Sequence, residues 1–126
     1  MVEPGRGATS KHTEAQGSSR IDELFSVADL EQAAANHQSA IRTYRRILDG
    51  EVTVAEKARA LMGIGACLER VGRWKEALNI LVEASSAARE AGDDLILARV
   101  LVTLGDIRLG RGETEAALDC ARESLE

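Results

Sequence analysis

The sequence predicts an all-α fold, made of three antiparallel helical hairpins that stack as a right-handed α-solenoid. Apolar residues recur at helical spacing from Ile21 onward, and no segment shows the alternation of a strand. The composition is 44% hydrophobic but only 2% aromatic, so Ala, Leu, Ile and Val must form the core. The chain also aligns with itself, because residues 58–86 resemble residues 98–126.

Two regions are expected along the chain. Residues 1–19 are rich in Gly, Ser, Thr and Gln without an apolar period, which is typical of a disordered tail. Residues 20–126 are expected to form one helical repeat domain. Its repeats are expected at about 21–54, 58–92 and 98–126.

Turn and capping signals divide this domain into six expected helices. Thr53 and Glu56 form the pattern of a capping box at the start of the third helix, and Asp93 or Asp94 can cap the fifth. Glycines are expected to end the helices and to separate the fifth from the sixth: Gly50, Gly72, Gly92, Gly110 and Gly112.

Each repeat has a small residue in both of its helices, at a constant interval. The pairs are Ala28 and Ala40, Gly65 and Ala77, and Gly105 and Ala117. A small residue is needed where two helices cross closely, because a large side chain would push them apart. The interval therefore predicts one close helix crossing in each hairpin.

These positions lie in a recognisable motif. The middle repeat reads Leu61-x-x-Ile64-Gly65-x-x-Leu68, followed by Ala77-x-x-x-Leu81. The motif resembles the tetratricopeptide repeat, and the resemblance covers residues 21–126, with a degenerate first copy. The long spacing resembles the long-helix repeats of kinesin light chains, Pins-type polarity adaptors and bacterial regulators. The resemblance implies a TPR-like protein-binding module.

Charge and composition exclude several other classes. The net charge of −5 argues against non-specific binding to nucleic acid or to anionic membranes. No apolar run is long enough for a transmembrane helix, and Met1–Arg20 has no apolar segment, so a cytoplasmic location is expected. Cys67 and Cys120 are expected to be small buried residues.

No catalytic constellation is found. Gly63-x-Gly65 lies inside an expected helix, and His37 is expected in a solvated turn. We therefore expect no enzymatic activity, no metal site and no cofactor.

The first helices of the hairpins are expected to line a concave groove. The groove residues are Phe25, Asp29, Arg59, Met62, Ala66, Arg70, Arg99, Val102 and Asp106. Phe25, Met62 and Val102 would form an apolar strip, and Arg59 and Arg99 a basic rim. The rim is interpreted either as a site for partner carboxylates or as a set of helix-surface salt bridges.

Three functional hypotheses remain open. The first is an adaptor that binds a protein or peptide segment in the groove. The second is the ligand- or peptide-sensing part of a larger bacterial transcriptional or signalling regulator. The third is a structural repeat that self-associates through its last helix, since no capping helix follows that helix.

Overall fold

A computed structural model of the chain describes residues 20–125, which are helical apart from short connections. The expected tail at 1–19 lies outside the described residues. The first helix covers residues 20–33. Residues 20–125 contain no strand. The other helices are α2 (His37–Asp49), α3 (Val54–Arg70), α4 (Trp74–Ala91) and α5 (Asp94–Leu125). The expected all-α helical repeat fold is confirmed.

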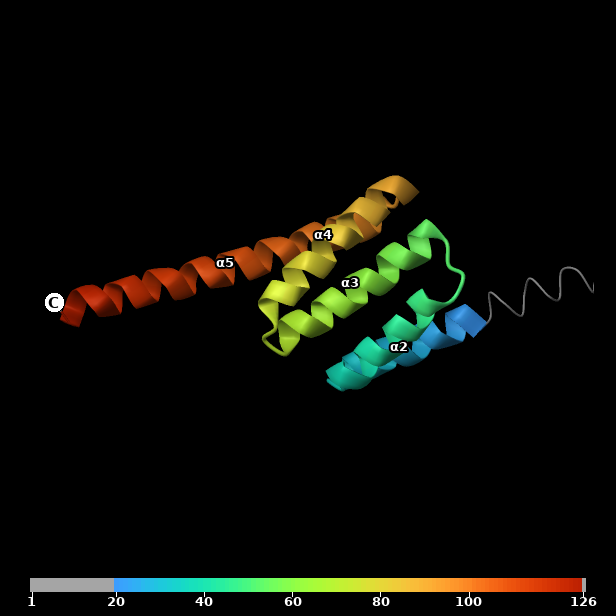
Figure 1. Cartoon of the computed structure of the whole chain (residues 1–126), viewed down its shortest axis with the longest axis horizontal. Coiled ribbons are helices and arrows are strands. Elements are labelled where there is room, and N and C mark those ends of the chain that lie inside the picture. Colours follow the sequence, from blue (N-terminus) through green and yellow to red (C-terminus); the bar gives the residue numbers. More distant parts are fainter. Residues whose placement is uncertain (1–19, 126) are drawn as a thin grey trace, which may run out of the picture.

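The helices pack as consecutive antiparallel neighbours (Figure 1). The first helix and α2 form one hairpin, and α3 and α4 form a second. The first part of α5 packs on α4 and also reaches α3, so α3 lies in the middle of the stack. This central position explains why α3 is rich in buried small and aliphatic side chains.

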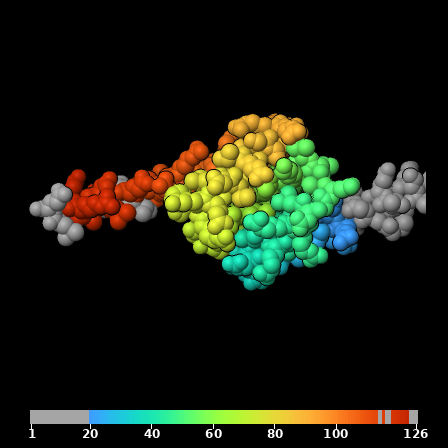
Figure 2. All heavy atoms as spheres, viewed as in Figure 1, coloured from blue at the N-terminus to red at the C-terminus, as the bar shows by residue number. Residues whose placement is uncertain are grey.

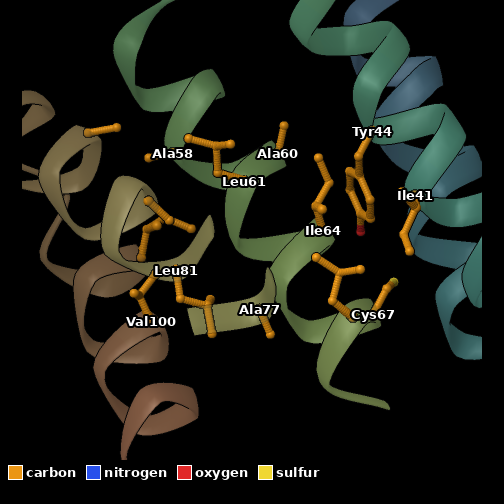
Figure 3. Packing of buried hydrophobic residues seen from close by; sticks show 14 of the residues in the cluster. Ile41, Tyr44, Ala58, Ala60, Leu61, Ile64, Cys67, Ala77, Leu81 and Val100 are labelled. Atoms are coloured by element: carbon orange, nitrogen blue, oxygen red, sulfur yellow. The ribbon is translucent and has the colours of Figure 1, made fainter. Parts of the chain in front are cut away.

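The core lies on both sides of α3 (Figure 3). Ile64 and Cys67 lie on the side of Tyr44 in α2, whereas Leu61 lies towards Leu81 in α4. All five side chains are buried. Burying a side chain of this size contributes about 1.5–3 kcal/mol. The two hairpins are therefore held together by aliphatic packing across α3, as the composition predicts.

The expected signals set most helix ends. Thr53 Oγ1 accepts the Glu56 amide at 3.1 Å, and the Glu56 carboxylate accepts the Thr53 amide at 2.8 Å, which completes the capping box. Gly72 and Gly92 adopt left-handed φ values of 83° and 69°. Glycine reaches this region without a steric cost. The Asp93 carboxylate caps α5 by accepting the Ile96 amide at 3.0 Å.

The third expected hairpin does not close. α5 runs for 32 residues through Gly110 and Gly112, where a turn between the fifth and sixth helices is expected. The expectation of six helices is therefore wrong, because the last two form one helix. Figures 1 and 2 show the end of α5 as an arm that leaves the compact body.

Two features explain the continuous helix. A glycine inside a helix costs only about 1 kcal/mol, which a neighbouring contact can offset. Arg111 supplies such contacts, because its guanidinium lies 4.0 Å from the ring centre of Trp74 and 3.2 Å from the Glu115 carboxylate across Gly112. A closed third hairpin would also bury less apolar surface than the second hairpin does. The third repeat has Arg108 and Ala121 where the second repeat has Leu68 and Leu81.

Candidate peptide-binding groove

A groove of about 770 Å³ lies on one face of the stack. The first helix, the turn after it, α2, α3 and α5 contribute side chains to it, whereas α4 contributes none. The lining residues are Asp29, Gln32, Ala33, Ala35, His37, Tyr44, Arg59, Met62, Ala66, Arg70, Arg99 and Thr103. The first helices of successive repeats thus supply most of the groove surface.

Asp29 is the centre of a small polar network in the groove lining. One carboxylate oxygen accepts a hydrogen bond from the Arg59 guanidinium at 2.9 Å, and the other accepts from the Tyr44 hydroxyl at 2.6 Å. The Arg59 guanidinium also lies 4.0 Å from the ring centre of Phe25. Arg59 is therefore fixed by an ion pair and a cation–π contact.

Tyr44 keeps its proton in this network. Burial raises the pKa of its hydroxyl, and the hydrogen bond to the Asp29 carboxylate raises that pKa further. Both effects disfavour the phenolate, the first because it would be poorly solvated and the second because the neutral hydroxyl is the donor. Tyr44 is therefore a hydrogen-bond donor that orients Asp29 towards Arg59.

The structure brings six of the nine predicted groove residues together. Asp29, Arg59, Met62, Ala66, Arg70 and Arg99 line the groove. The other three are elsewhere. Phe25 is only 2% exposed, so the expectation that it offers an apolar surface to a partner is wrong. Its aromatic ring forms part of the core and packs against the Arg59 guanidinium.

Val102 and Asp106 lie outside this groove. Val102 is 64% exposed on α5, and Asp106 lines a second, smaller hollow beside Trp74 and Arg111. The expected apolar strip is therefore reduced to Met62, since Phe25 is buried and Val102 does not line the groove. Of the three groove residues expected on α5, only Arg99 therefore lines the groove.

The groove is more basic than the protein. Its lining carries three arginines and one aspartate, whereas the whole chain has a net charge of −5. Arg59 is paired with Asp29, which agrees with the interpretation of the basic rim as a set of helix-surface salt bridges. Within residues 20–125, Arg70 and Arg99 form no ion pair. Of the three groove arginines, only Arg59 therefore has an ion-pair partner within the described part of the chain.

Several lining residues were not predicted. Tyr44 and His37 belong to α2, a second helix of a hairpin, and Thr103 lies one turn after Arg99 on α5. His37 is half-buried rather than solvated, and its Nδ1 has no hydrogen-bond partner among the described residues. Tyr44 is the only tyrosine of the chain, and its large side chain reaches across the hairpin to Asp29. An isolated large polar aromatic residue in a chain with few aromatics was the available sequence signal.

Metal binding and cysteine reactivity are two other kinds of chemistry to consider in residues 20–125. They contain no group of three or more His, Cys, Asp or Glu side chains that could hold a metal ion. Burial raises the pKa of the Cys67 thiol to about 11, which keeps this cysteine an inert core residue. Cys120 is exposed on α5, so the expectation that both cysteines are buried is wrong for Cys120.

No helix within residues 20–125 is both long and apolar enough to cross a membrane.

Paired antiparallel helices that leave a groove on one face define the class of helical repeat proteins. The model of the tetratricopeptide repeat family matches residues 56–126, more than half of the chain. The chain therefore belongs to the tetratricopeptide repeat family, whose repeats generally mediate protein–protein interactions and are typically not enzymes. Neither the curated proteins nor the solved structures gave a match.

Proposed function

We propose that the chain is an adaptor-type interaction module that binds an acidic peptide segment of a protein partner in the groove. The observation that carries this proposal is the local charge, since the groove has three arginines and one aspartate in a chain of net charge −5. An arginine side chain can pair with a carboxylate through two parallel hydrogen bonds. A partner segment with Asp or Glu side chains matches this arrangement.

The three arginines have different roles in the proposal. Arg59 contacts Asp29 and Phe25, so its main role is to shape the groove lining. Arg70, at the end of α3, and Arg99, on α5, have exposed side chains that line the groove. Arg70 and Arg99 are therefore the residues expected to contact partner carboxylates.

The apolar part of the groove is small. Met62 and Ala66 are half-buried on α3 and lie between the arginines in the sequence of that helix. Met is flexible and adapts to differently shaped apolar groups. We therefore expect a partner segment with a single apolar anchor flanked by acidic side chains.

Panning a phage-displayed library of random peptides against the purified chain tests the proposal. Wild-type protein should enrich peptides with Asp and Glu. The double variant Arg70→Glu/Arg99→Glu should bind the enriched peptides at least tenfold more weakly, because a hydrogen bond to a charged group contributes about 1.5–3 kcal/mol and about 1.4 kcal/mol is tenfold in affinity. Arg59 is left unchanged because its loss would also disturb Phe25.

The matched control is Arg45→Glu/Arg46→Glu, which makes the same charge change on exposed positions of α2 outside the groove lining. Helicity measured by circular dichroism should be the same for both variants. Enrichment without an acidic bias would contradict the proposal. Equal loss of affinity in the two double variants would also contradict it, because net charge rather than the groove would then determine binding.

A further inference from the structure

α5 carries a helix-packing surface that no other helix within residues 20–125 covers. The offset of forty residues relates Ala98, Leu101 and Gly105 of α5, here called the α5 seam, to Ala58, Leu61 and Gly65 of α3. The three α3 residues are buried, whereas the three α5 residues are exposed. The contrast is largest for the leucines, since Leu61 is 3% exposed and Leu101 is 47% exposed.

The glycines give the same contrast at atomic detail. A Cβ built on Gly65 would lie 2.5 Å from Cδ2 of Leu81, so α4 packs directly against this position. A Cβ built on Gly105 would meet nothing within 4 Å. Gly105 thus has the residue type that a close helix crossing requires, but no described helix lies against it.

The segment that corresponds to α4 is present in the same chain. The offset relates residues 73–85 to residues 113–125, here called the projecting segment, and the family model covers both. The projecting segment extends α5 beyond the body (Figures 1 and 2). Leu118 is 51% exposed, and Cys120 is exposed beside it. While α5 continues through Gly112, the projecting segment cannot reach the α5 seam of its own chain.

The projecting segment and the part of α5 that carries the seam have net charges of opposite sign. The projecting segment has four acidic residues and one arginine, which gives it a net charge of −3. Residues 94–112 of α5 have three arginines and two aspartates, which gives them a net charge of +1. Opposite charge favours pairing of an acidic segment with this part of α5 and steers the encounter.

We propose that two copies of the chain exchange their projecting segments, so that each segment packs on the α5 seam of the other copy. Each segment would take the position that α4 holds against α3 in the second repeat, with Ala121 in place of Leu81. Exchange of an identical element gives a closed dimer, because each copy offers one segment and one seam. Gly110 and Gly112 are the hinge, since glycine adopts helical and left-handed backbone conformations at little cost.

Sedimentation of the full 126-residue chain over a wide range of concentration tests this exchange. Wild-type protein should pass from the mass of one 13.5-kDa chain to that of two. Gly105→Leu should abolish the dimer, because the added side chain fills the α5 seam where a helix must approach closely. Gly105→Ala is the matched control and should keep the dimer, because Ala121 stands where the second repeat has the larger Leu81.

A second variant changes the projecting segment instead of the α5 seam. Ala121→Arg changes an exposed position of the projecting segment, so it leaves the body unaltered and should also abolish the dimer. This variant decides the matter if Gly105→Leu fails to fold. A mixture of Gly105→Leu and Ala121→Arg chains should form a dimer more weakly than wild type, because one seam and one segment remain compatible.

Two results would overturn the exchange. The first is a wild-type monomer at every concentration, which would mean that the projecting segment folds back on its own chain or stays unpaired. The second is a dimer that survives both Gly105→Leu and Ala121→Arg. If such a dimer is lost in Arg70→Glu/Arg99→Glu, the acidic projecting segment occupies the groove rather than the seam. Because the groove is intact in both single variants, failure here leaves the proposed function untouched.

Discussion

Gly63 and Gly65 let α3 approach both of its neighbours closely. A Cβ at Gly63 would overlap the ring of Tyr44 in α2, and a Cβ at Gly65 would lie 2.5 Å from Leu81 in α4. Both contacted side chains are buried and cannot move away freely. Gly65 and Leu81 belong to the repeat motif, so their contact is the structural reason for the small residue at that position of the motif.

The pair Gly65→Ala and Gly105→Ala tests this reason. Alanine in a helix is favoured over glycine by about 1 kcal/mol, but overpacking a filled core costs about 1–3 kcal/mol. Gly65→Ala should therefore lower the free energy of unfolding, whereas Gly105→Ala should leave it unchanged or raise it. Urea denaturation of both variants measures the difference. A stabilised Gly65→Ala variant would show that the close approach to Leu81 is not required.

The two cysteines should differ in reactivity. The pKa of Cys67 is raised to about 11 by burial, so at pH 8 only about one thiol in a thousand is ionised. Cys120 is exposed on the projecting segment. A thiol reagent should therefore modify one cysteine rapidly in the folded chain and both in denaturant, as mass spectrometry can measure. Rapid modification of Cys67 in the folded chain would contradict its place in the core.

The same shift makes stability depend on pH. The folded pKa of Cys67, about 11, exceeds the ordinary value of 9.0, so the folded state favours the protonated thiol. This contribution to stability is complete below pH 9 and is lost as the pH rises towards 11. The free energy of unfolding should fall over that interval, and it should fall less in Cys67→Ala when each protein is compared with its own value at pH 8.

At the scale of the helices, α3 depends on its first turn. Thr53 and Glu56 satisfy each other's backbone amides, and Val54 and Ala55 between them are half-buried. Thr53→Ala removes the acceptor for the Glu56 amide and should lower stability by about 1 kcal/mol. Urea denaturation measures this change. Thr53→Ser keeps the hydroxyl and should retain most of the wild-type stability, and a loss as large as that of Thr53→Ala would exclude the capping role.

Glycine signals were reliable only where packing agreed with them. Gly72 and Gly92 are left-handed turn residues, as expected, but Gly110 and Gly112 are helical. The residue type is the same, so the difference comes from the side chains further along the chain. The helix after Gly72 buries Leu81 in the core, whereas the equivalent residue after Gly112 is the smaller Ala121. Helix periodicity does not measure this packing energy. The sequence therefore predicted a turn at Gly110 and Gly112, where the helix continues.

At the scale of the molecule, the groove was predicted in outline because repeat geometry assigns the first helices to one face. Arg59, Arg70 and Arg99 were found this way. The state of each arginine was not predictable, because the pairing of Arg59 with Asp29 joins residues 30 apart in the sequence. Burial of Phe25 was missed for a related reason, since Arg59 covers it from α3. Contacts between hairpins cannot be derived from the period of one helix.

The central claim is that the groove is the binding surface, and mapping of backbone amide shifts by NMR tests it most directly. An acidic peptide selected on the wild-type chain should shift the amide resonances of Met62, Ala66 and Thr103, which belong to the groove lining. The resonances of Val82 and Glu83, exposed on α4 away from the groove, should stay in place. Shifts centred on Val82 and Glu83, with the groove resonances unchanged, would contradict the account.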